Sequence, residues 1–211
     1  MSLKQKIKTK LQENVTLRGL LFLYRTYFGF SRSKFGYIGE KVSLNPPLAL
    51  SNTRNIYLYG DNKLDNAVVL TTNAKFIMKE HSAAAQGLKV ATGNHVNVIG
   101  KNYREITEAE KPKGFDQDVI VEENVWIGMN VVLLSGVTVG RGGTVAAGSV
   151  VTKSLPPYCI SGGVPAKPIK FKWTIDEIME HERILYPDNE RFTREELEKI
   201  FAETKTKKPT A

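Results

Sequence analysis

Aliphatic residues recur at every sixth position along the second half of the chain. The longest run is unbroken and consists of Val121, Ile127, Leu133, Val139, Val145 and Val151. Four residues after each of these stands a second apolar or small residue: Val125, Val131, Val137, Gly143, Ser149 and Leu155. An α-helix repeats its apolar positions at about 3.6 residues and a half-buried strand at about two, so neither element explains this period. The run predicts short strands joined by tight corners, with one aliphatic residue per side pointing into a triangular coil.

The same spacing recurs earlier in two weaker blocks. One consists of Leu58, Leu64, Leu70 and Phe76, and the other, after a phase shift of two residues, of Met78, Ala84 and Val90. Stacked coils bury a continuous core that no single coil can form, so we expect one solenoid domain over residues 38–172. The repeat disappears from the polar segment 96–118 and resumes after it. We expect this segment to be an extruded loop, because long structureless loops in compact domains are commonly functional.

Helices are expected on both sides of the solenoid. Residues 3–28 carry apolar side chains at spacings of three and four, which predicts a helix in an N-terminal segment 1–37. Two capping-box patterns and a proline predict two short helices in a C-terminal segment 173–211: Thr174 with Glu177, Thr193 with Glu196, and Pro187 between them. The tail 205–211 is expected to be disordered.

Positive charge is concentrated at the start of the chain. The net charge is +8, and the first 41 residues hold nine Lys and Arg against Glu13 and Glu40, a balance of +7. A basic amphipathic helix within residues 1–30 fits peripheral contact with an anionic membrane. It also fits a helix packed on the open end of the solenoid. A nucleic-acid partner is excluded, since the chain has neither a recognisable module nor a basic stripe with stacking aromatic residues.

The single cysteine and the short apolar stretches point to the cytoplasm. Cys159 alone forms no internal disulfide or thiolate cluster, which favours a reducing compartment and a role as a small core residue. The most apolar stretch, residues 20–28, is interrupted by Arg25 and is too short to cross a bilayer. It also lacks the pattern of a signal peptide. We expect a cytoplasmic protein, with the inner membrane surface as a possible site of contact.

Several segments of the repeat resemble the hexapeptide-repeat acyltransferases. They are residues 124–128, 136–140, 146–153, 156–158 and 162–167, which read NVWIG, GVTVG, AAGSVVTK, PPY and GGVPAK. Within this family the chain looks most like O-acetyltransferases of the galactoside, maltose and capsular-polysaccharide type. The resemblance implies an all-β fold, a left-handed parallel β-helix with flanking N- and C-terminal α-helices, which departs from the usual right-handed crossover. It also implies a homotrimer that binds acetyl-CoA between neighbouring prisms.

Acyl transfer to a hydroxyl requires a general base, and the chain has three histidines. His181 stands outside the repeat, and His81 stands in the middle of a hexad, where a corner or solvent-facing position is expected. His95 comes directly before the extruded loop and 31 residues before Trp126. The resemblance assigns the catalytic histidine to this place, so His95 is the expected base. Asp65 or Asn66 on the preceding coil is a candidate for orienting its ring.

The resemblance also implies a site for the acetyl donor. It places the backbone of Met129 beside the thioester, as a catalytic donor to the oxyanion. Its expected acetyl-CoA contacts are Trp126, Gly128, Ala147, Thr152, Lys153 and Lys170, with Lys167 and Lys172 assisting. Other interpretations stay open at each position. The small residues also suit hexad packing, Trp126 also suits a subunit contact, and the lysines also suit a solvated face.

The sequence therefore favours transfer of acetyl from acetyl-CoA to a sugar hydroxyl on a surface glycan or its precursor. An antibiotic O-acetyltransferase of the streptogramin or chloramphenicol type is the main alternative, and N-acylation of nucleotide sugars is a further variant. A zinc carbonic anhydrase with the same type of prism is another alternative, but its metal site needs three converging imidazoles. Only His81 and His95 lie within the repeat, so no metal is expected.

Overall fold

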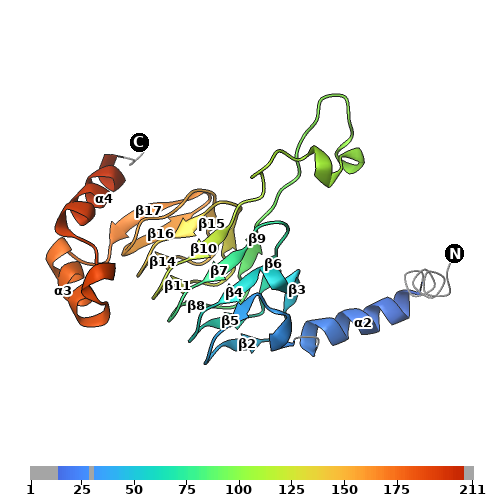
Figure 1. The fold of residues 1–211 in the computed structure, drawn as a ribbon, viewed down its shortest axis with the longest axis horizontal. Helices are drawn as coiled ribbons and strands as arrows, with labels where there is room; N and C mark the ends of the chain where they lie inside the picture. The colour runs from blue at the N-terminus through green and yellow to red at the C-terminus, as the bar shows by residue number, and fades with distance from the viewer. Residues whose placement is uncertain (1–13, 29–30, 207–211) are drawn as a thin grey trace.

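The computed structural model describes residues 14–28 and 31–206, and in it three parallel sheets form the sides of a prism (Figure 1). Sheet A contains β1 (Tyr37–Ile38), β4 (Ile56–Leu58), β7 (Phe76–Met78), β10 (Val119–Val121) and β13 (Thr138–Val139). Sheet B contains β2 (Ser43–Asn45), β5 (Lys63–Asp65), β8 (Ala83–Ala84), β11 (Trp126–Ile127), β14 (Thr144–Val145), β16 (Cys159–Gly163) and β17 (Ala166–Phe171). Sheet C contains β3 (Ala49–Ser51), β6 (Val68–Leu70), β9 (Lys89–Ala91), β12 (Val132–Leu133) and β15 (Val150–Val151).

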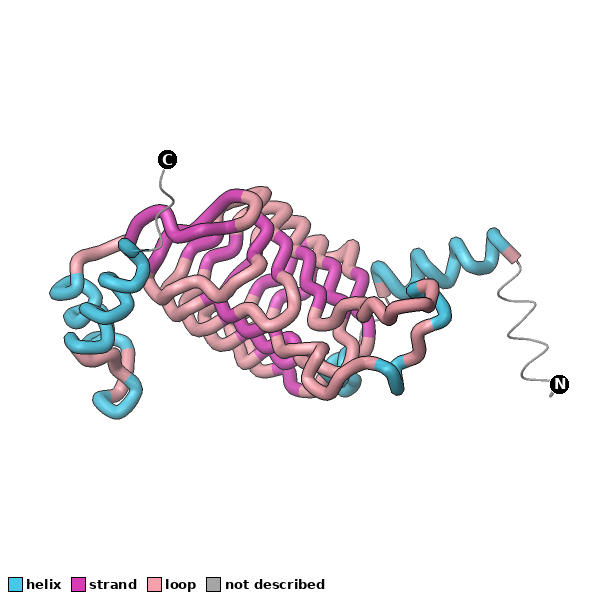
Figure 2. The backbone as a smooth tube through the Cα atoms, turned by 90° about the horizontal axis from the view of Figure 1, so that it is seen from above, coloured by secondary structure: helices cyan, strands magenta, loops and turns pink. Residues whose placement is uncertain are grey.

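The chain visits sheets A, B and C in turn and then begins the next coil. Each strand pairs in parallel with the equivalent strand one coil later, and the antiparallel hairpin of β16 and β17 ends the prism. This winding confirms the expected parallel β-helix, and Figure 2 shows the successive coils side by side.

The hexad pattern predicted the inward side chains of the last two coils correctly. All six aliphatic residues of the unbroken run are at most 1% exposed. Val121 pairs with Val139, Ile127 with Val145 and Leu133 with Val151, so residues three hexads apart stack along the prism axis. This stacking forms the continuous apolar core.

In the earlier coils the inward-pointing side chains do not all follow the six-residue spacing, and Leu70 is the exception. Leu58 pairs with Met78, which shows that these coils contain 20 residues rather than three hexads. The two extra residues shift the frame on sheet C, where Val69 is fully buried and Leu70 is 49% exposed. A shift of one residue turns a strand side chain to the opposite face. The expectation that Leu70 points inward is therefore wrong, and Val69 takes its place.

The predicted extruded loop is present. It leaves the prism after β9, returns at β10, and contains the short 3₁₀ helices η3 (Tyr103–Glu105) and η4 (Glu108–Glu110). Figure 1 shows it extending well away from the sheets. Hydrogen bonds and charge from Lys101, together with bonds from Thr107, lower the pKa of Glu110 to about 2. The Glu110 carboxylate accepts hydrogen bonds from the Thr107 nitrogen and hydroxyl at 2.9 and 3.0 Å and pairs with Lys101, so the loop is held by contacts within itself.

Among the described residues, helix α2 precedes the prism and helices α3 and α4 follow it. Asn14 caps α2 (Val15–Tyr27), and its side chain accepts a hydrogen bond from the Leu17 nitrogen at 2.9 Å. The predicted start of this helix, at residue 3, lies outside the described residues. The remaining short helices of the first coils are η1 (Arg32–Lys34) and η2 (Thr53–Asn55).

The C-terminal segment contains α3 (Ile175–Leu185), η5 (Asp188–Glu190) and α4 (Arg194–Thr206). Both predicted capping boxes form, because Glu177 and Glu196 accept hydrogen bonds from the backbone of Thr174 and Thr193. Lys205 and Thr206 are the last two residues of α4, and the expected disorder of the tail stays a prediction. The rest of the tail lies outside the described part of the chain.

Cys159 is buried in the body of the protein with its thiol free, as expected of a core residue. Burial raises the pKa of this thiol. In the part of the chain that the structure describes, no helix has both the length and the apolar character needed to cross a membrane.

Candidate active site

His95 lies at the corner of the prism between sheets C and A, where the extruded loop begins. Its side chain is exposed. The loop brings Tyr103 back over it, with the two ring centroids 5.7 Å apart and the ring planes at 71°. The imidazole is therefore accessible from solvent and bordered on one side by an aromatic ring.

The backbone leading to His95 is held by the buried side chain of Thr92. The Thr92 hydroxyl accepts a hydrogen bond from the Thr72 nitrogen at 3.1 Å and donates one to the Ala74 carbonyl at 3.1 Å. The Thr92 carbonyl accepts a further bond from the Ser135 hydroxyl at 2.8 Å. Three successive coils are thus tied together directly before the histidine.

Gly93 follows Thr92 at a point where no side chain fits. A Cβ atom there would lie 2.8 Å from a carboxylate oxygen of Asp116 and closer still to the Thr72 hydroxyl. Glycine permits this close approach of the backbone to both groups. The Thr-Gly-Asn-His segment is thereby explained by the packing at the base of the loop.

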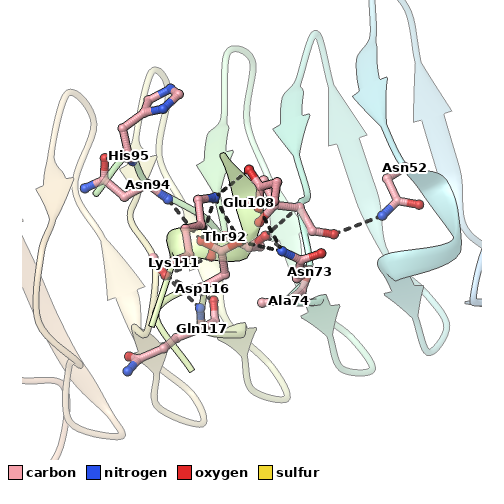
Figure 3. A network of polar contacts seen from close by, with 12 residues as sticks. Asn52, Asn73, Ala74, Thr92, Asn94, His95, Glu108, Lys111, Asp116 and Gln117 are labelled. Atoms are coloured by element: carbon pink, nitrogen blue, oxygen red, sulfur yellow. Dashed lines mark hydrogen bonds and ion pairs between the residues drawn. The ribbon is translucent and has the colours of Figure 1, made fainter. Parts of the chain in front are cut away.

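Asp116 joins the beginning and the end of the loop, and its side chain is 4% exposed. Its carboxylate accepts hydrogen bonds from the Asn94 nitrogen at 3.4 Å and the Asn73 amide at 3.2 Å, and lies 3.4 Å from the Lys111 ammonium. Burial raises the pKa of Asp116, but bonds from Thr72 and Asn94 and the charge of Lys111 outweigh it, so the pKa is lowered. Figure 3 shows this network, with the His95 ring projecting away from it.

A cavity of about 350 Å³ lies beside His95, between the prism and the loop. It is lined by His95, Val96, Tyr103, Arg104, Ile106, Thr107, Glu108 and Lys111. The wall therefore combines one aromatic ring, hydroxyl and carboxylate acceptors, and two cationic side chains. Such a mixed lining suits a polar molecule with several hydroxyl groups.

Met129 and Ala147 lie at a different corner, between sheets B and C. The two coils are joined there by the Gly148 nitrogen, which donates to the Met129 carbonyl at 2.8 Å. Met129 is 51% exposed, Ala147 is exposed, and Trp126 on sheet B is 49% exposed. These residues are therefore accessible on the outside of the prism.

Gly128 is buried, unlike its neighbours at this corner. A Cβ atom on it would lie 2.6 Å from the Ala147 nitrogen. Stacking of the coils thus accounts for the glycine without a ligand. Its contact with acetyl-CoA stays a prediction.

The predicted lysines gather near the C-terminal end of the prism. Lys153 and Lys167 line a common cavity of about 660 Å³, closed on one side by Ile200, Glu203 and Thr204 of α4. Thr152 precedes Lys153 at the corner between sheets C and A, and Lys170 is exposed on β17. Burial lowers the pKa of Lys172. The structure brings Lys153 and Lys167 together, whereas Lys170 does not line the same cavity.

The other candidate residues lie on other corners. Asp65 and Asn66 stand between sheets B and C, and the Asp65 carboxylate is bound by Lys63 at 2.8 Å and by Asn45. Within one chain their expected role in orienting His95 is therefore wrong, because they occupy a different edge of the prism from His95. His81 stands at the third corner, as expected, and its ring nitrogen lies 2.9 Å from Asp61. Within the described ranges, no three His, Cys, Asp or Glu side chains gather as a metal site.

Sequence reasoning missed Asp116, Thr92 and Tyr103. Asp116 stood among many charged residues of a polar segment, and nothing in its spacing marked it as buried. Thr92 stands three residues before His95 and directly before Gly93, and this closeness in the sequence was the one available signal. Tyr103 reaches His95 only because the loop folds back.

The repeat matches a known family model, described as bacterial transferase hexapeptide (six repeats), over residues 118–153. A probable macrolide acetyltransferase of Lysinibacillus sphaericus is 34% identical over 109 residues, 52% of this chain and 59% of that protein. The galactoside O-acetyltransferase of Escherichia coli K12 is 29% identical over 140 residues, 66% of this chain and 65% of that protein. The chain thus spans less than two thirds of the length of these curated relatives.

Solved structures share the fold. A hexapeptide-repeat acetyltransferase from Vibrio cholerae, in complex with acetyl coenzyme A, aligns with a TM-score of 0.56 and 26% identity. That alignment covers 74% of this chain and 85% of the other. Residues 118–153 thus match the bacterial transferase hexapeptide repeat, and the fold is similar to that of hexapeptide-repeat acetyltransferases.

Proposed function

We propose that the protein is a CoA-dependent O-acetyltransferase that acts on a sugar hydroxyl of a surface glycan or its precursor. The proposal rests on the accessible His95 imidazole. The backbone before it is held by the hydrogen bonds of Thr92, and the ring lines a cavity with polar and aromatic side chains. The acetyltransferases among its relatives supply the reaction class.

His95 is the general base in this proposal. Its imidazole takes the proton from the acceptor hydroxyl while the hydroxyl oxygen attacks the thioester carbonyl of acetyl-CoA. A backbone N–H at Met129 stabilises the negative charge that develops on the carbonyl oxygen. When the tetrahedral intermediate collapses, the carbon–sulfur bond breaks and the departing thiolate takes the proton from the imidazolium. The products are the acetyl ester and CoA, and His95 returns to its neutral form.

The active form in this proposal is a homotrimer. His95 and Met129 lie on two different edges of one prism, so a single chain does not present both to the same acetyl group. A neighbouring prism that faces the His95 edge with its own Met129 edge completes the site. A head-to-tail contact of this kind closes into a ring of identical subunits.

Acetyl-CoA then lies along the cleft between two prisms. Ala147 and the neighbouring glycines leave room for the pantetheine arm, and Trp126 and Thr152 border its path. The anionic end of CoA lies toward Lys153, Lys167 and Lys170, because cationic side chains neutralise phosphate charges there. Since acetyl-CoA is the donor and the lone cysteine is free, the proposal includes a cytoplasmic location.

The test compares two histidine variants. Thiol release from acetyl-CoA is measured with oligosaccharide acceptors for the wild type, His95→Ala and His81→Ala. Loss of a general base lowers turnover by about 100-fold or more, so His95→Ala is expected to lose activity to this extent. His81→Ala removes an exposed imidazole from another corner and is expected to keep wild-type turnover. Turnover of His95→Ala within twofold of wild type would overturn the assignment.

An antibiotic O-acetyltransferase is the second candidate function. It is favoured by the probable macrolide acetyltransferase and by a chloramphenicol acetyltransferase of Klebsiella aerogenes, which is 39% identical over 61 residues, 29% of each chain. Expression in a sensitive strain, followed by growth on chloramphenicol, a streptogramin and a macrolide, separates the two candidates. Resistance that depends on His95 would favour this second function.

A further inference from the structure

Helix α2 carries a broad apolar face exposed to solvent. The face is formed by side chains at spacings of three and four, together with their neighbours, which are between 37% and 75% exposed: Leu20, Leu21, Leu23, Tyr24, Tyr27 and Phe28. Large contiguous apolar surfaces of this kind mark contacts with a protein partner or a membrane.

This face points away from the rest of the protein. Among the described side chains of α2, Thr26 alone is buried, and its carbonyl accepts a hydrogen bond from the Leu48 nitrogen at 3.1 Å. Thr26 stands on the side of the helix opposite to Leu17, Tyr24 and Phe28, by the helical period. Figures 1 and 2 both show the helix extending beyond the end of the prism. The interpretation that it packs on the open end of the solenoid is therefore wrong for the described residues.

The charge of the helix favours an anionic surface. Its two charged residues are Arg18 and Arg25, and it contains no Asp or Glu. The preceding thirteen residues of the sequence add four lysines and one glutamate. A second copy of this segment would bring like charges together, whereas anionic lipid headgroups complement them. The tyrosines suit the same place, since their rings have an apolar body and a polar hydroxyl.

We infer that α2 docks the protein on the surface of an anionic lipid bilayer. The helix of 13 residues is too short to span the hydrocarbon core, so it lies in the interface. Leu20, Leu21 and Tyr24 enter the acyl region, and Arg18 stays among the headgroups. This inference goes beyond the proposed acetyl transfer and does not depend on it.

Co-sedimentation of the full-length protein with lipid vesicles tests the inference. Vesicles of phosphatidylcholine with phosphatidylglycerol are compared with vesicles of phosphatidylcholine alone. The wild type is expected to bind the anionic vesicles, and more weakly as salt is raised. The double variant Leu20→Glu/Tyr24→Glu is expected to bind at least about tenfold more weakly, because it places two carboxylates in the apolar face.

A matched variant controls for exposed apolar residues in general. Ile184→Glu/Leu185→Glu changes two exposed apolar residues of α3, at the other end of the prism, and is expected to bind like the wild type. Thermal unfolding of both variants should match the wild type, since neither changes a buried residue.

Three results would overturn the inference. They are equal binding by Leu20→Glu/Tyr24→Glu and the wild type, no preference for anionic vesicles, and a smaller oligomer of this variant without lipid. The last result would assign the face to contacts between copies of the chain. Turnover with a water-soluble acceptor, measured in parallel, reports separately on the proposed acetyl transfer.

Discussion

The carboxylate of Asp116 lies 3.4 Å from the backbone nitrogen of Asn94, the residue directly before His95. This contact joins the two ends of a long loop at the point from which the imidazole projects. Asn94 also accepts a hydrogen bond from the His95 nitrogen at 2.8 Å. The position of the proposed base therefore depends on a buried acid that has no direct contact with it.

Asp116→Asn is expected to lower kcat for acetyl transfer by about tenfold, with a free energy of unfolding lower by about 1–3 kcal/mol at pH 7. The amide cannot supply the negative charge that Lys111 and the Asn94 nitrogen face. Steady-state kinetics and urea unfolding measure the two effects. Asp188→Asn, at a 91% exposed partner of Arg191 in the C-terminal segment, serves as the control and is expected to change neither. Equal losses in both variants would contradict the role of Asp116.

The stabilisation from Asp116 is expected to depend on pH. Because its pKa is lower in the folded protein than the ordinary value of 3.8, the ionised carboxylate favours folding at every pH above that value. The contribution is lost as the pH falls through the lowered pKa. The difference in free energy of unfolding between wild type and Asp116→Asn should therefore be full at pH 7 and shrink below about pH 4. If this difference in free energy of unfolding grew as the pH was lowered, the ionised carboxylate would not be the stabilising form.

A site shared between prisms predicts complementation. His95→Ala removes the base from one edge, and Ala147→Trp fills the expected pantetheine path on the other edge. Each variant alone is expected to be inactive. Co-expressed in equal amounts, they should recover about a quarter of the wild-type turnover, because random mixing leaves about one contact in four with both edges intact. No recovery from mixed trimers, verified by two different affinity tags, would place each site within one chain.

The change of frame at sheet C predicts different costs for two leucines. Leu64 is 1% exposed in β5, whereas Leu70 is 49% exposed in β6. Leu64→Ala is expected to lower the free energy of unfolding by about 2–5 kcal/mol, since it leaves a cavity in the core. Leu70→Ala is expected to cost less than about 0.5 kcal/mol. Denaturant unfolding measures both free energies. A larger loss for Leu70→Ala than for Leu64→Ala would show that Leu70 points into the core, as the six-residue spacing predicts.

Glu182 is expected to hold the C-terminal helices on the prism. Its carboxylate is 1% exposed, lies 3.0 Å from the Arg141 guanidinium, and accepts a hydrogen bond from the Tyr158 hydroxyl. Glu182→Ala leaves the Tyr158 hydroxyl without its buried acceptor, while Arg141 keeps Glu123 as a partner at 3.1 Å, so we expect a loss of about 1–3 kcal/mol. Glu180→Ala removes an exposed pair with Arg183 and should unfold like the wild type. Similar thermal midpoints for both variants would count against the buried pair.

Arg104 is expected to contribute to binding of the acceptor. It lines the cavity beside His95, whereas Lys113 of the same loop lines a separate cavity. Arg104→Ala should raise KM for the sugar acceptor about five- to tenfold, the loss of roughly one hydrogen bond to a charged donor, and leave KM for acetyl-CoA unchanged. Lys113→Ala should alter neither constant. A change confined to the KM for acetyl-CoA would move Arg104 to the donor site.

The sequence alone was sufficient for the solenoid, the loop and the capped C-terminal helices. A period of six leaves one geometric solution for Val121 to Val151, because each aliphatic residue must reach the same core. Capping boxes are equally local, since Thr174 and Glu177 stand three residues apart. His95 was conspicuous for a similar reason, as a histidine next to a break in the repeat.

Only the tertiary structure decided which edge of the prism each residue occupies. Whether Val69 or Leu70 points inward depends on two extra residues per coil, and a shift of one residue reverses the face. Asp116 meets Thr72 and Asn73 because coils stack, although it stands more than 40 residues after them in the chain. The sequence likewise does not show that the apolar face of α2 is exposed, because a buried helix and a helix without a partner have the same apolar pattern. Local patterns determine elements, whereas contacts between distant coils determine the site.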